Sequence, residues 1–359
     1  MPKPLPPPTL VSGALRLPQP LPYRGPPVPV EMDWDEAIDL HRRELAGERR
    51  QRARPWTEAE LMAAAARCTA DAIALLAPQV DLLDAGGLDE DDPVRAAARR
   101  FDGCELEGAL VLPVEWVAEA APPALVAPPR LRDRRVHRQR WQAAQALTSK
   151  PVKLSLLGPL TLARAVEDRL FGGNRAACAD AFAEALNPAL RDLAAAGCPA
   201  VEIVEPVLAT EGAVAEAELE ALSRLLHKVP ADTARWLRLV AGDAVPAWAG
   251  AAPATRLDTA LAFAEDLPFD GVVLEPEPAL AEPGAVALWR RLRIALLVMP
   301  PDAAGEAAVE RGIGWLSAAA ARLEPDRLVA AIDGGGTRAT SRLAMRLEAL
   351  QRTVRGFVG

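Results

Sequence analysis

The chain contains few of the residues that form metal centres and disulfides. Among its 359 residues are three histidines and four cysteines, which are Cys68, Cys104, Cys178 and Cys198. No two cysteines have C-x-x-C spacing, and no histidine lies near any of them in the sequence. This pattern predicts neither a structural zinc site nor a disulfide framework, and it is typical of a protein from the reducing cytoplasm.

Aromatic residues, positive net charge and long apolar runs are also lacking. Aromatics make up 4% of the chain, with one tyrosine, so a base-stacking surface is not expected. The formal net charge of −8 argues against a nucleic-acid partner. No apolar run reaches the length of a membrane span, and the N-terminus lacks the features of a signal peptide. We expect a cytoplasmic protein that binds a small molecule, with no nucleic-acid partner and no membrane association.

The hydrophobic pattern predicts an α/β fold. Half of the residues are hydrophobic and a quarter are charged, which is enough for a large core. Eight short apolar runs bounded by Gly or Pro predict strands that begin near residues 9, 81, 152, 200, 236, 271, 293 and 328. Eight strands with intervening helices indicate a TIM-type (β/α)8 barrel. The alternative, an open doubly wound sheet, lacks a Gly-rich dinucleotide turn after its first strand.

We expect one domain. Residues 1–30 are a Pro-rich lead-in that includes the first strand, and residues 31–359 form a single barrel domain with an excursion at about 101–135. Within the excursion, Glu105–Trp116 is expected as a hairpin and Pro122–Arg135 as a connector rich in Pro and Arg. One helical span of roughly 35 residues is expected to join the strands near residues 152 and 200. The other predicted helices span residues 31–51, 56–76, 138–148, 215–228, 257–267, 305–323 and 339–354.

The central strand–helix–strand unit carries two distinctive turns. Leu157–Thr161 (Leu-Gly-Pro-Leu-Thr) follows one strand, and Glu205-Pro206 follows the next. Such turns lie at the carboxyl ends of parallel strands, where α/β proteins place their ligand-binding groups. The two motifs resemble the cobalamin-independent methionine synthase family, which belongs with uroporphyrinogen decarboxylase to one superfamily of barrels. This resemblance covers most of the chain and implies a barrel with methyl-transfer chemistry.

The resemblance also implies where a zinc site would lie. A zinc-dependent methionine synthase holds its metal with His and Cys from one strand end, Glu from the next and Cys from the last, and the zinc activates the substrate thiol. In this chain Leu239–Ala241 stands at the His-x-Cys position, Glu275 matches the Glu, and Gly334 stands at the final Cys. A catalytic zinc needs about three protein ligands. The comparison therefore predicts that the zinc-thiolate site is lost.

Polar residues at the predicted strand ends form the candidate site. Glu205 and Glu275 are the candidate catalytic residues, as acid, base or amine-binding groups; hydrogen bonding to loop amides is the alternative role for both. The turn Asp333–Arg338 (Asp-Gly-Gly-Gly-Thr-Arg) can present N–H groups to an anion, although a mobile loop remains the alternative. Asp84 also stands at a predicted strand end. The predicted ligand-binding residues are Ser12, Thr161, Asp243, Asp333, Gly334, Gly335 and Arg338.

Three functions remain open. The first is a divergent enzyme that moves a methyl or other one-carbon unit from a carrier, with folate and corrinoid as candidates, to a small acceptor. The second is a non-catalytic barrel that binds a pteridine-like or tetrapyrrole-like ligand or docks onto a protein partner. Asp333-Gly334 resembles the Asp-Gly turn of the zinc-free N-terminal barrel of methionine synthases. The third is a uroporphyrinogen-decarboxylase-like lyase. The Arg-rich N-terminal motif of that family is not found, although Arg16 and Arg24 lie close to where it would fall.

Overall fold

A computed structural model gives the fold of most of the chain. It describes residues 9–12, 58–85, 93–106, 122–209, 214–239, 267–274, 292–299, 306–321, 323, 325–333 and 340–358. The helices predicted at residues 31–51 and 257–267 lie outside these ranges. Among the described helices, none has the length and apolar character that a membrane span requires.

The centre of the molecule is a curled sheet of eight strands, a half-barrel whose neighbouring strands are all parallel. The strand order is β1-β11-β10-β9-β8-β7-β5-β2. All eight strands occur at the predicted positions, because each is a short apolar run that Gly or Pro bounds. The strands are β1 (Thr9–Ser12), β2 (Leu83–Asp84), β5 (Val152–Leu157), β7 (Ala200–Val204), β8 (Ala234–Arg238), β9 (Gly271–Leu274), β10 (Arg293–Met299) and β11 (Leu328–Asp333).

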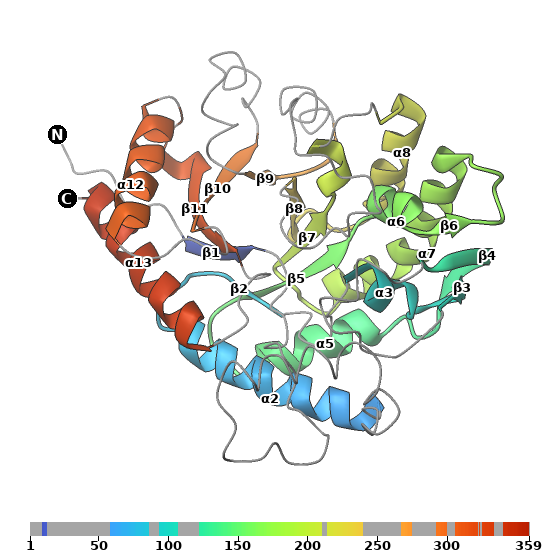
Figure 1. Cartoon of the computed structure of the whole chain (residues 1–359), viewed down its shortest axis with the longest axis horizontal. Helices are drawn as coiled ribbons and strands as arrows, with labels where there is room; N and C mark the ends of the chain where they lie inside the picture. Colours follow the sequence, from blue (N-terminus) through green and yellow to red (C-terminus); the bar gives the residue numbers. More distant parts are fainter. Residues whose placement is uncertain are drawn as a thin grey trace, which may run out of the picture.

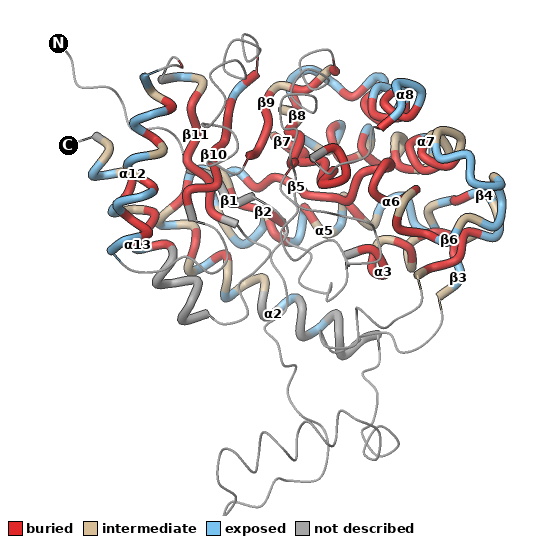
Figure 2. Tube along the Cα trace, turned by 45° about the horizontal axis from the view of Figure 1, so that its top comes forward, coloured by how far each residue is buried: buried red, intermediate tan, exposed pale blue. Residues whose placement is uncertain are grey.

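Helices cover the convex face of this sheet (Figure 1). The helices predicted near residues 56–76, 138–148, 215–228, 305–323 and 339–354 are confirmed. The strands and the sheet-facing sides of these helices are mostly buried (Figure 2). The helices are α2 (Glu58–Leu76), α3 (Pro93–Ala98), α5 (Val136–Gln145), α6 (Pro159–Ala165), α7 (Arg175–Ala195), α8 (Glu216–Leu225), α12 (Glu306–Ala320) and α13 (Thr340–Val358), with 3-10 turns η2 (Pro206–Ala209) and η5 (Pro325–Arg327).

The two faces of the sheet pack into separate apolar clusters. The larger cluster joins one face of the strands to the helices. The smaller contains only strand residues and those next to them, so it lies on the concave face. Its largest member, Trp236, packs flat against Gly271, where an added Cβ would lie 2.5 Å from the indole ring. The members of this inner cluster are Ala200, Trp236, Val273, Ala295, Leu297, Val329 and Ala331.

The single helical crossover predicted between β5 and β7 is wrong, because the segment forms two helices. α6 ends at Ala165, and α7 begins at Arg175 after a short strand, β6 (Glu167–Asp168). Gly172 and Gly173 break the helix with φ angles of 62° and 83°. The Asp168 carboxylate holds the turn by accepting hydrogen bonds from the N–H groups of Leu170, Phe171 and Gly173. Gly197, with φ of 94°, follows the end of α7 as predicted.

The excursion forms a second sheet of three strands. β3 (Phe101–Glu105) pairs antiparallel with β4 (Ala124–Leu131), and β6 pairs with the first two residues of β4. The connector predicted at Pro122–Arg135 is therefore wrong, since most of it is strand. Pro128 and Pro129 are tolerated because β6 ends before them on one side of β4, and on the other side they lie where the register with β3 shifts, between the pairs Asp102–Arg130 and Cys104–Leu125. The hairpin predicted at Glu105–Trp116 lies mostly outside the described residues.

Candidate active site

Glu205 follows the last residue of β7 and turns its side chain toward the start of α6. One carboxylate oxygen accepts a hydrogen bond from the Leu160 N–H at 2.8 Å. The other accepts from the Thr161 N–H at 2.7 Å and from the Thr161 hydroxyl at 2.5 Å. Both side chains are fully buried. The carboxylate thus satisfies N–H groups that a helix cannot pair within itself, which ties the turn after β5 to the end of β7.

The buried position of Glu205 affects both its ionisation and its neighbour Gly158. Burial raises the pKa of Glu205 to about 7, although the bonds from Thr161 and Leu160 and the charge of Arg164 act in the opposite direction. A Cβ at Gly158 would lie 2.1 Å from a Glu205 carboxylate oxygen. The absence of a side chain at Gly158 therefore makes room for the carboxylate.

A buried ion pair supports α6 from its other end. Arg164 lies 3.3 Å from a carboxylate oxygen of Glu218 at the start of α8, and both side chains are nearly buried. The other Glu218 oxygen accepts from the N–H of Ala215, before the first turn of α8. Together with Glu205, these contacts fix α6 between β7 and α8.

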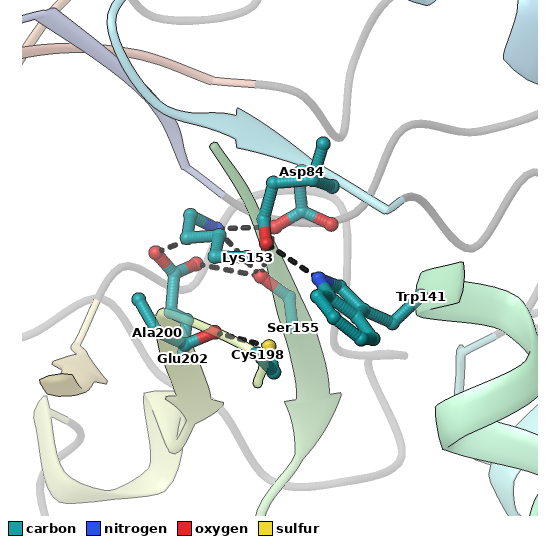
Figure 3. Close-up of polar contacts among 8 residues, drawn as sticks. Asp84, Trp141, Lys153, Ser155, Cys198, Ala200 and Glu202 are labelled. Atoms are coloured by element: carbon teal, nitrogen blue, oxygen red, sulfur yellow. Dashed lines mark hydrogen bonds and ion pairs between the residues drawn. The ribbon is translucent and has the colours of Figure 1, made fainter. Parts of the chain in front are cut away.

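A second polar cluster lies inside the curled sheet (Figure 3). The Lys153 ammonium on β5 contacts the Asp84 carboxylate of β2, the Ser155 hydroxyl at 2.8 Å and the Glu202 carboxylate of β7 at 3.1 Å. Ser155 donates to Asp84 and also lies 3.2 Å from Glu202. Lys153, Glu202 and Asp84 are at most 1% exposed. Burial raises the pKa of Asp84, and the neighbouring charge of Glu202 adds to this against the opposing charge of Lys153.

Sequence reasoning did not single out Lys153, Ser155 or Glu202. The apolar character of Val152–Leu157 and Ala200–Val204 predicts buried strands and gives no reason to assign a site to their polar residues. A signal was present, because Lys153 and Ser155 alternate with apolar residues at the period of a strand, as Glu202 does in β7. The register places Asp84 directly beside Lys153, and Ser155 beside Glu202, so three neighbouring strands direct polar groups to one point.

The structure brings together some of the other predicted site residues. Ser12 and Asp333 are register partners at the carboxyl ends of β1 and β11. Thr161 lies in the first turn of α6, where it is fully buried against Glu205. The remaining predicted positions lie outside the described residues; they are Asp243, Glu275, Gly334, Gly335 and Arg338.

Residues 44–232, more than half of the chain, match the family described as "Cobalamin-independent synthase, Catalytic domain". The chain belongs to this family. The methionine-synthase-like resemblance of Leu157–Thr161 and Glu205-Pro206 is thereby confirmed. A comparison with curated proteins finds no match for this family member.

Solved structures show that this cobalamin-independent synthase family member shares its fold with methionine synthases. A B12-independent methionine synthase from Shewanella sp. W3-18-1 in complex with selenomethionine is 18% identical, with a TM-score of 0.71 over 98% of this chain and 97% of that one. A putative B12-independent methionine synthase from Listeria monocytogenes is 14% identical, with a TM-score of 0.59 over 95% and 97%. A methyltransferase from Methanosarcina mazei is 13% identical, with a TM-score of 0.54 over 95% and 96%.

Among the residues that the structure describes, the donor atoms of this cobalamin-independent synthase family member do not fit a catalytic zinc. Leu239, which the resemblance aligns with the family His, is an apolar residue buried in the core. Burial raises the thiol pKa of Cys104 to about 11 and those of Cys178 and Cys198 to about 12, which disfavours the thiolate that zinc requires. Within the described part of the chain, no three His, Cys, Asp or Glu side chains converge as a metal-binding group.

Proposed function

We propose that this protein is a divergent methyl or one-carbon transferase that acts on a small molecule without a zinc-thiolate site. The observation that carries the proposal is the combination of the family match with a strand end that has no His or Cys ligands. The resemblance aligns the buried Leu239 with the family His, whereas Ser12 and Asp333 are register partners at neighbouring carboxyl ends. The acceptor would then be activated by carboxylates, which take the place of the zinc ion.

The proposed active site lies at the mouth of a closed (β/α)8 barrel. Around the sheet, the strands from β2 through β5, β7, β8, β9 and β10 to β11 follow one another in the order of the sequence. β1, the first strand of the chain, lies next to β11. The two ends of this series, β1 and β2, contact each other. Closure between β1 and β2 would direct all eight carboxyl ends to one opening, as in other barrels of this type.

Each predicted site residue has a proposed role at this opening. Glu275 accepts the proton that an acceptor releases when it takes up a methyl group, or it binds the acceptor's amine. Ser12 and Asp243 hold the small molecule by hydrogen bonds, and Asp333 to Gly335 with Arg338 bind its anionic part. Thr161 was also predicted to bind the ligand, but it is fully buried and its hydroxyl donates to Glu205, so its proposed role is to hold the turn after β5. A folate or a corrinoid supplies the methyl group. The catalytic role predicted for Glu205 stays a prediction.

One observation favours a non-catalytic barrel as the second candidate. The Glu205 carboxylate, the acid of the Glu-Pro turn after β7, accepts hydrogen bonds from the N–H groups of Leu160 and Thr161. An acid that holds a helix in place is not available to a substrate without breaking these bonds. A barrel that binds a pteridine-like ligand or docks onto a protein partner would use the same fold without chemistry.

The test combines metal analysis with a methyl-transfer assay. Chelator-treated protein is incubated with 13C-methyl tetrahydrofolate or 13C-methylcobalamin and a panel of small thiols and amines, and the labelled product is detected by NMR. We expect transfer that survives chelation and falls at least about tenfold in Glu275→Gln, while Glu216→Gln on α8 has wild-type activity. Stoichiometric zinc whose removal abolishes transfer would overturn the zinc-free mechanism. Binding of a carrier without transfer would favour the non-catalytic barrel.

A further inference from the structure

The three acceptors around the Lys153 ammonium form an oxygen cage. An ammonium group has three N–H donors, and the structure provides three acceptors, from the side chains of Asp84, Ser155 and Glu202. They come from strands β2, β5 and β7, so the cage spans neighbouring strands (Figure 3). Two carboxylates and a hydroxyl are also the oxygen donors that hard cations select in proteins.

The nature of the cation is informative because lysine is rare in this chain. The sequence contains 37 arginines and four lysines, which are Lys3, Lys150, Lys153 and Lys228. Lys153 is fully buried, whereas Lys150, three residues earlier, is partly exposed beside Asp81. A compact ammonium can meet three oxygens that surround a point, but the planar guanidinium of arginine cannot. The cage therefore fits a spherical cation of ammonium size.

Electrostatics show why the cage needs an occupant. Two buried carboxylates next to each other repel, and a positive charge between them offsets this repulsion. At 0% and 1% exposure, Glu202 and Asp84 have little hydration to offset this repulsion. The Lys153 ammonium compensates the charge at the centre of the cluster, where a bound cation would do so in other proteins.

We propose that Asp84, Ser155 and Glu202 form an internal site for a monovalent, ammonium-type cation, and that the Lys153 side chain is its built-in occupant. The site is separate from the methyl-transfer chemistry proposed above, and it does not depend on that function. It gives the interior of the sheet a fixed positive charge that the protein carries in its own sequence. Removal of the Lys153 side chain converts the cage into a site for an external cation.

Chemical rescue of Lys153→Ala tests this directly. The atoms that the substitution removes correspond to n-propylammonium, which can occupy the vacated space and donate to the same three oxygens. Wild type and variant are unfolded in urea and refolded in n-propylammonium, tetramethylammonium or sodium chloride at equal ionic strength, so that the cage fills as the chain folds. We expect n-propylammonium to raise the melting temperature of Lys153→Ala by roughly 2–4 °C over the other two salts. Wild type responds equally to all three.

Two control variants separate the site from general salt effects. Lys150→Ala removes a partly exposed lysine of the same segment, and we expect no selective response to n-propylammonium. The triple substitution Asp84→Asn, Lys153→Met and Glu202→Gln replaces the charged groups by neutral groups of similar size, and it is also expected to show none. If Lys153→Ala folds only with n-propylammonium present, the refolded yield in each salt replaces the melting temperature.

Amine labelling gives a second readout on the unaltered protein. Reductive methylation with 13C-formaldehyde of the folded chain is expected to leave Lys153 unmodified and to label it only after unfolding, as mass spectrometry of the peptides shows. Equal rescue by n-propylammonium and tetramethylammonium, which has no N–H donor, would overturn the proposal. So would modification of Lys153 in the folded protein at the rate of Lys150.

Discussion

The hydroxyl of Thr161 donates to the Glu205 carboxylate at 2.5 Å, and both residues are fully buried at the junction of β7 and α6. A hydrogen bond to a charged acceptor contributes about 1.5–3 kcal/mol, roughly twice the contribution of a neutral one. The contact joins two consecutive βα units at their carboxyl ends. Its strength therefore determines how firmly the turn after β5 is held.

Thr161→Val removes this hydroxyl and keeps the shape of the side chain. We expect a loss of about 1.5–3 kcal/mol in the free energy of unfolding, measured by urea denaturation at a pH above the Glu205 pKa of about 7, where the carboxylate is charged. Thr233→Val is the matched control, because the buried Thr233 hydroxyl donates to the neutral carbonyl of Cys198 at 3.1 Å. That control should lose about 0.5–1.5 kcal/mol. Equal losses in both variants would show that the charge on Glu205 does not strengthen its bond.

The ionisation of Glu205 predicts a pH dependence of stability. Burial raises its pKa from 4.5 to about 7, so between these values the folded chain keeps a proton that the unfolded chain has released. This contribution to stability is fully present below about pH 4.5 and is lost as the pH rises through about 7. One pKa unit corresponds to about 1.4 kcal/mol, so the loss amounts to roughly 3 kcal/mol.

Glu205→Gln tests this pH dependence because it keeps the size of the side chain and cannot titrate. Urea unfolding of wild type and variant is compared from about pH 5 to pH 8. We expect the stability of wild type to fall more steeply than that of the variant as the pH rises. Parallel curves would mean that the carboxyl group has the same pKa in the folded and unfolded chain. Asp84 titrates in both proteins, so the difference between them isolates Glu205.

Gly158→Ala places a methyl group against the Glu205 carboxylate. The Cβ would lie 2.1 Å from one oxygen of a carboxylate group that three hydrogen bonds hold in position, so we expect a destabilisation of about 1–3 kcal/mol. Gly314→Ala in α12 is the control, because a Cβ there meets no atom within 4 Å. In a helix this change is expected to stabilise by about 0.5–1 kcal/mol. Thermal or urea unfolding of both variants measures the contrast.

Asn187 connects α7 to the end of α8. Its amide group donates to the carbonyls of Leu225 and His227, both at 2.8 Å, which α8 cannot pair within itself. Asn187→Ala is expected to cost about 1–2 kcal/mol, and Asn187→Asp more, because a carboxylate would face two carbonyl oxygens. Urea denaturation at neutral pH provides the comparison. A smaller effect for Asp than for Ala would contradict the observed orientation of the amide.

The positions of the strands could be predicted, whereas the side-chain partners inside the sheet could not. Val152–Leu157 is apolar enough to indicate a buried strand, but a lysine within it is rarely fully buried, so the alternation carried little weight. The partner of Lys153 lies 69 residues earlier, at Asp84, and only the register of β2 beside β5 brings them together. The break in the crossover had a local signal, Gly172-Gly173, which the strong helical composition around it obscured.

In the candidate site, too, the position of a residue could be predicted but its side-chain contacts could not. The Glu-Pro turn after β7 indicated that Glu205 would stand at a strand end, and it does. Whether its oxygens would face a ligand or loop amides depended on the path of α6, which is set by tertiary packing. The absence of His and Cys from the expected zinc positions could be seen directly in the sequence.

The short pairing of β2 has a consequence for how the molecule opens. β2 is paired with β5 at two positions, whereas β7 is paired with β8 at five. Backbone amides beside so short a ladder exchange with solvent through small local openings. The ionic contact between Asp84 and Lys153 joins the same two strands. Side chains therefore stabilise the pairing of β2 with β5, where few backbone hydrogen bonds do so.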